Sequence, residues 1–86
     1  MNKRNELIKN LKPSYQAVLY QLDLIIQNNQ QPVHITTLMN LTGYERRTVQ
    51  RAIKAAISLN LYQRKRNKPN DPYTYTQSIP PSPLNN

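Results

Sequence analysis

Cysteine and tryptophan are absent from the sequence, and histidine and glycine occur once each. Without cysteine, a disulfide framework and a thiolate-based metal or redox site are both excluded. His34 has no second imidazole or thiolate with which to share a metal ion, so we expect no metal site. No apolar run approaches the roughly 18 residues of a membrane span, and residues 1–6 lack the apolar segment of a secretion signal. These absences predict a cytoplasmic protein without membrane contact.

Acidic residues are also scarce. The chain has 86 residues with only four Asp and Glu against 12 Lys and Arg, which gives a formal net charge of +8. Four scattered acids leave little material for acid–base catalysis, and no Ser/His/Asp set, glycine-rich phosphate loop or pair of carboxylates is evident. We therefore predict no enzymatic activity and no cofactor. A strong positive charge on a chain of single-domain length favours a polyanionic partner, most often a nucleic acid.

The positive charge is concentrated in residues 45–68, where eight basic residues face one acidic residue, Glu45. A solvated helix face normally mixes charges of both signs, because like charges at neighbouring helix positions repel. A run of one sign therefore favours a polyanion-binding surface over a merely solvated one. The eight residues are Arg46, Arg47, Arg51, Lys54, Arg64, Lys65, Arg66 and Lys68.

Apolar periodicity predicts a first long helix that starts after Pro13, with Ser14 as its N-cap. Its buried face would comprise Tyr15, Val18, Leu19, Leu22, Ile25 and Ile26. The polar tract 27–32 has nothing to bury and predicts a connecting loop. Residues 1–13 are compatible with either a short extra helix or a basic arm. Their apolar side chains are Leu7, Ile8 and Leu11.

The middle of the chain predicts a short strand and a short helix that ends in a tight turn. Residues 33–36 alternate apolar and polar side chains, which favours a very short strand. Residues 37–41 then favour a short helix capped by Thr36 or Thr37. Gly43 supplies the positive φ of the turn at low steric cost.

A second long helix is predicted over residues 45–59, beginning at Tyr44 or Glu45. Its buried face would comprise Val49, Ala52, Ile53 and Ala56. Leu59 continues the buried side. Asn60 suits the left-handed residue after the helix, because asparagine tolerates that backbone better than most residues.

Residues 61–66 and 73–77 predict an antiparallel hairpin, because aromatic and β-branched residues in these segments flank a connection dense in turn residues. Leu61 and Tyr75 are its expected core residues. Since side chains alternate along a strand, Lys65 must lie on the sheet face opposite to Arg64 and Arg66. The proline-rich residues 78–86 are expected to form a disordered or extended tail.

Two adjoining segments follow a known pattern: residues 38–53, containing Leu41-Thr42-Gly43-Tyr44 and Arg47-Thr48-Val49-Gln50-Arg51-Ala52-Ile53, and the segment Leu59-Asn60-Leu61-Tyr62-Gln63-Arg64. Over residues 14–77 the sequence resembles the winged helix-turn-helix superfamily of DNA-binding domains. The resemblance implies an α+β, mostly helical fold with three helices, a short strand and a two-stranded wing. Members usually have glycine where Asn60 stands.

The resemblance places the helix over 45–59 in the DNA major groove, with its exposed N-terminal half against the bases. Arginine pairs bidentately with guanine and glutamine with adenine. The candidate base-reading residues are Arg47, Thr48, Gln50 and Arg51. The candidate DNA-backbone contacts are Tyr44, Arg46, Lys54, Arg64, Lys65, Arg66 and Lys68, and we expect basic residues of the N-terminal segment to add to them.

We therefore expect a sequence-specific double-stranded DNA-binding protein, a transcriptional regulator that is nucleoid-associated in the cytoplasm. Two alternatives remain. The first is an accessory DNA-binding role in plasmid or phage replication or partition, and the second is a winged-helix adaptor that binds an acidic protein. Because one such helix covers only a few base pairs, we also expect a homodimer on a two-fold site. No small-molecule effector is evident.

Overall fold

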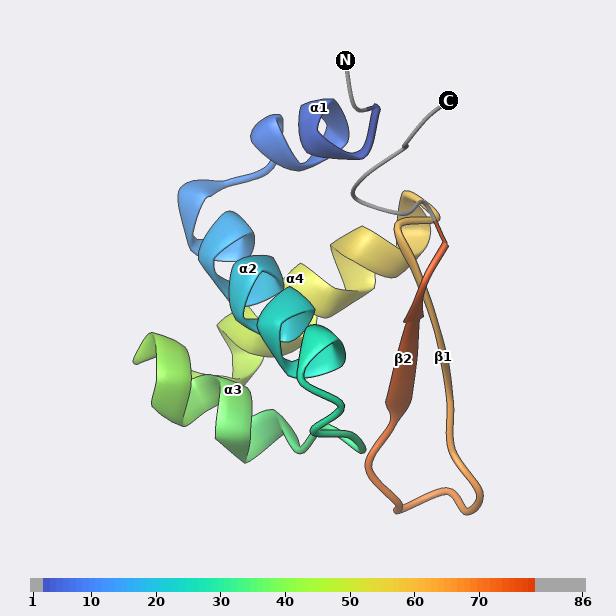
Figure 1. Ribbon diagram of the computed structural model, residues 1–86. Helices are drawn as coiled ribbons and strands as arrows, with labels where there is room; N and C mark the ends of the chain where they lie inside the picture. The colour runs from blue at the N-terminus through green and yellow to red at the C-terminus, as the bar shows by residue number, and fades with distance from the viewer. Residues whose placement is uncertain (1–2, 79–86) are drawn as a thin grey trace.

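The computed structural model describes residues 3–78, which form four helices and one two-stranded antiparallel sheet (Figure 1). The elements are α1 (Lys3–Lys9), α2 (Pro13–Gln27), α3 (Ile35–Thr42), α4 (Arg46–Ser58), β1 (Tyr62–Lys65) and β2 (Thr74–Gln77). The expected α+β, mostly helical class is confirmed, and the first segment forms the short extra helix. Within residues 3–78, no helix is long and apolar enough to cross a membrane. The expected tail lies outside the described residues except for Ser78.

The hydrophobic core lies where α2, α3 and α4 pack against one another, and the base of the hairpin closes it. The predicted α4 stripe of Val49, Ala52, Ile53 and Ala56 is buried, as are Val18, Leu19, Leu22 and Ile25 on α2. Tyr15 and Ile26 of the predicted α2 stripe are half-buried and pack against the core. Leu61 and Tyr75 are buried as predicted, and Tyr62 joins them. The expectation for Leu59 is wrong. Helix α4 ends at Ser58, so Leu59 leaves the helical stripe and is 37% exposed.

Three helix starts and one strand differ from the sequence-based expectation. Helix α4 begins at Arg46, because Glu45 is its extended N-cap residue. Helix α2 begins at Pro13 with Lys12 in the N-cap position, because proline at the first helical position is already set to a helical φ. Helix α3 begins at Ile35 after His34, so Thr36 and Thr37 lie inside its first turn and neither is the cap. Of residues 33–36, which were expected to form a strand, Ile35 and Thr36 therefore lie in α3.

Of the expected short strand only a single bridge remains, between Val33 and Tyr73 on β2's side of the hairpin. The Val33 N–H donates to the Tyr73 carbonyl at 2.9 Å. Next to it, the Gln31 side-chain amide forms two hydrogen bonds with the backbone of Tyr75, as a neighbouring strand would. Its Nε2 donates to the Tyr75 carbonyl at 3.0 Å, and its Oε1 accepts from the Tyr75 N–H at 2.5 Å. The loop before α3 therefore anchors β2 to the helical body.

The turn between α3 and α4 has the geometry expected from the single glycine. Gly43 follows α3 with a φ of 79°, and its N–H donates to the Met39 carbonyl at 2.8 Å. Asn60, after α4, has a φ of 61°, as expected for a left-handed residue before the hairpin. These two residues set the directions in which α4 and β1 leave the preceding helix.

Replacing Gly43 with alanine is expected to lower the free energy of unfolding by about 1–2 kcal/mol. Nothing lies within 4 Å of the added Cβ, so the loss reflects backbone strain and not a clash. Gly43→Asn is the control and should retain most of the stability, because asparagine tolerates positive φ. Urea denaturation measures both variants. An alanine variant as stable as the parent would contradict the left-handed geometry.

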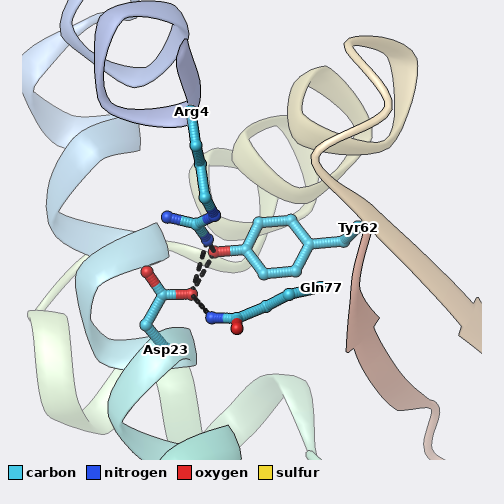
Figure 2. A network of polar contacts seen from close by, with 4 residues as sticks. All are labelled: Arg4, Asp23, Tyr62 and Gln77. Carbon is cyan, nitrogen blue, oxygen red and sulfur yellow. Dashed lines mark hydrogen bonds and ion pairs between the residues drawn. The ribbon is translucent and has the colours of Figure 1, made fainter. Parts of the chain in front are cut away.

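A buried polar network ties α1 to the base of the hairpin, and Figure 2 shows its four side chains converging. The Arg4 Nη2 donates to Asp23 Oδ1 at 2.7 Å and also to the Tyr62 hydroxyl oxygen. The Tyr62 hydroxyl donates to the same carboxylate oxygen, and Gln77 Nε2 donates to it at 2.9 Å. Burial raises the pKa of the Tyr62 hydroxyl, and the Asp23 carboxylate raises it further. The network thus joins α1, α2, β1 and β2.

Candidate nucleic-acid interface

A basic groove of about 620 Å³ lies between α4 and the hairpin, with the start of α3 at one side. Helix α4 contributes Arg46, Gln50 and Lys54, and the hairpin contributes Arg64, Arg66 and Tyr73. We call these six residues the groove set. His34 and Asp71 also line the groove, so one carboxylate accompanies its four fixed positive charges. The fold thus brings together cations that lie up to 20 residues apart in the chain.

The residues of α4 separate into two exposed stripes. Arg46, Gln50 and Lys54 follow one another at four-residue spacing, which places them on the helix side that borders the groove. Arg47 and Arg51 are exposed on the neighbouring stripe, which does not line the groove. Thr48 is half-buried and therefore less accessible than the other candidate base-reading residues.

The hairpin cations differ in whether they line the groove. Arg64 and Arg66 line it, whereas Lys65 is exposed outside it, as strand alternation predicts. Lys68, in the connection between the strands, is also exposed outside the groove. The guanidinium carbons of Arg64 and Arg66 lie 4.3 Å and 4.4 Å from the centroid of the Tyr73 ring. Both arginines are thus stacked on one aromatic side chain in the groove.

Most tyrosines serve the core. Tyr75 and Tyr62 are buried. Tyr44, whose hydroxyl was expected to contact the DNA backbone, is half-buried and packs against the core. Burial raises the pKa of the Tyr75 hydroxyl, while the neighbouring Arg64 guanidinium acts in the opposite direction. Tyr20, by contrast, is 63% exposed on α2.

The expected contribution of the N-terminal basic residues needs one correction. Arg4 is 2% exposed and forms an ion pair with Asp23, so its charge is matched inside the protein. Helix α1 also lies at the opposite end of the molecule from the hairpin tip (Figure 1). Lys3, Lys9 and Lys12 are exposed at that end, away from the groove.

Sequence reasoning missed the roles of Tyr73 and His34 in the groove. The hairpin register could have indicated Tyr73, because Arg64 pairs with Tyr75 and Lys65 with Thr74, which brings Tyr73 opposite Arg66. No sequence signal marks His34, whose position depends on how the loop after α2 packs. Within residues 3–78, no group of three or more His, Cys, Asp or Glu side chains is placed to hold a metal ion.

No protein-family model, curated protein or solved structure matches this chain.

Proposed function

We propose that this chain binds double-stranded DNA as a winged helix-turn-helix domain, with α4 in the major groove and the β1–β2 hairpin as the wing on the adjoining backbone. One observation carries the proposal: cations from α4 and from the hairpin line the same groove. An α-helix fits the major groove of B-DNA, and a strand's phosphates would then lie between the helix and the hairpin. A charge spread evenly over the surface would not favour this docking.

The two stripes of α4 suggest a division of roles. Arg47 and Arg51, on the outward stripe, are the proposed base-reading arginines. Gln50 lies between Arg46 and Lys54 on the groove stripe, so it would contact a base at the edge of the major groove. The proposed contacts to the DNA backbone are Tyr44, Arg46, Lys54, Arg64, Lys65, Arg66 and Lys68. Thr48 contributes at the margin because it is half-buried.

The salt dependence of duplex binding tests the proposal. With about six to eight phosphate contacts, the logarithm of the binding constant should fall with the logarithm of salt concentration with a slope of about −5 to −7. Fluorescence anisotropy with a labelled duplex measures this slope. A slope near zero, or no binding at low salt, would contradict DNA binding and favour the adaptor alternative.

Two single substitutions separate base reading from backbone contact. Arg51→Ala should reduce the preference for a selected duplex over a random one, because it removes a base contact worth about 1–3 kcal/mol. Lys68→Ala removes the same charge from the hairpin and should weaken both duplexes equally. Identical behaviour of the two variants would show that α4 holds phosphates without reading sequence.

A further inference from the structure

The groove contains an unusual pairing of like charges. Arg64 and Arg66 lie on the same face of the hairpin, two residues apart, and both guanidinium groups stack on Tyr73. Within residues 3–78, neither arginine forms an ion pair with a carboxylate, although Asp71 lines the same groove. Both guanidinium groups lie within 4.4 Å of one ring centroid, so an anion that contacts both would offset the repulsion between their like charges.

The aromatic ring restricts how the two guanidinium groups can move. A guanidinium that stacks on a ring keeps its N–H groups in the plane of the fork, where they can still donate to an anion. Long arginine side chains otherwise lose conformational freedom when they bind. Stacking in the free protein removes part of that loss in advance. The planar fork also matches the oxygens of a phosphate group in a bidentate manner.

The charge and the volume of the groove favour an extended anion over a small one. Arg46 and Lys54 line the same groove from α4, so positive charge borders it on two sides. The groove volume of about 620 Å³ exceeds what one phosphate group fills, and it is open to solvent. A continuous phosphodiester strand could pass through such a groove and contact both sides.

We propose that Arg64 and Arg66, held on the Tyr73 ring, form a clamp for a phosphodiester group of a nucleic-acid strand that runs between α4 and the hairpin. Tyr73 is the positioning residue of this clamp, because it holds the two arginines that contact the ligand. The identity of the strand rests on the proposed function, whereas the phosphate clamp itself is tested separately below.

Duplex binding by four variants tests the clamp. Arg64→Gln with Arg66→Gln should lower the affinity for a random duplex about 30-fold at about 0.15 M salt, because two phosphate contacts are lost. Arg64→Lys with Arg66→Lys keeps the charge and loses the stacked fork, and should lower affinity about five-fold. Tyr73→Leu should have a similar five-fold effect, and Tyr73→Phe should stay within about two-fold of the parent.

The decisive measurement is the coupling between ring and arginines. Tyr73→Leu should have no further effect once both arginines are glutamine. If Tyr73→Leu lowers the affinity of the double glutamine variant as much as that of the parent, the clamp is wrong. It is also wrong if the double lysine variant binds as tightly as the parent. Thermal unfolding identifies any variant that loses its fold, and the double lysine variant, which leaves the ring in place, still decides the question.

Titration with inorganic pyrophosphate separates the clamp from the proposed function. In nuclear magnetic resonance spectra, the Nε–Hε signals of Arg64 and Arg66 should shift more than those of Arg47 and Arg51. If these shifts occur but the parent protein binds no duplex, the clamp stands and duplex binding is wrong. If the parent binds duplex with a steep salt slope but pyrophosphate shifts all four arginines equally, duplex binding stands and the clamp is wrong.

Discussion

Replacing Arg46, Arg64 and Arg66 together with glutamine is expected to lower the affinity for duplex DNA about 100-fold at about 0.15 M salt. Each lost phosphate contact lowers the magnitude of the salt slope by about 0.9, which corresponds to about 0.7 decades of affinity at this salt concentration. The slope itself should become shallower by about 2.7 units. Anisotropy titrations at several salt concentrations measure both quantities.

The control variant removes the same number of charges elsewhere. Lys3, Lys9 and Lys12 are exposed near α1, at the opposite end of the molecule from the hairpin tip (Figure 1). Their replacement with glutamine lowers the net charge equally, but it should change affinity less than about five-fold, because distant charges are screened beyond about 8 Å. Equal losses in the two triple variants would show that total charge, and not the groove, determines binding.

Replacing Asp23 with alanine is expected to lower the free energy of unfolding by about 3–5 kcal/mol. The carboxylate accepts hydrogen bonds from Arg4, Tyr62 and Gln77. Its removal takes away the carboxylate that pairs with the buried Arg4 guanidinium at 2.7 Å, and breaking a buried ion pair by removing one partner is strongly destabilising. Since small domains are stable by only about 5–15 kcal/mol, the melting temperature should drop clearly in calorimetry.

A double substitution distinguishes an unmatched charge from lost packing. Arg4→Met together with Asp23→Leu removes both charges and keeps apolar volume, so it should recover a large part of the lost stability. Glu6→Gln is the surface control, because Glu6 is exposed on α1 and should change stability by less than about 0.5 kcal/mol. If the double variant is no more stable than Asp23→Ala, the ion pair is not the source of the loss.

Apolar spacing and residue type predicted the parts of the fold that depend on neighbouring residues in the chain. The helical stripes of α2 and α4 follow from apolar spacing, and the positive φ of Gly43 and Asn60 follows from the backbone tolerance of those residue types. Alternation along β1 correctly separated Lys65 from Arg64 and Arg66. The helix starts were less predictable. Pro13 and Ile35 begin their helices one or two residues before the side chains that favoured capping, because the chain's path through the core also determines where a helix begins.

The concentration of positive charge in residues 45–68, and the order of a helix and then a hairpin in this stretch, follow from the sequence alone. Charge and periodicity are properties of neighbouring residues, so they can be read without a fold. Which charges lie close together in space depends on the packing of the elements. That packing buries Arg4 against Asp23, 19 residues away, and it brings Arg46 and Lys54 to the same groove as Arg64 and Arg66. Such pairings depend on how separate elements pack, and the spacing of residues along the chain does not specify that packing.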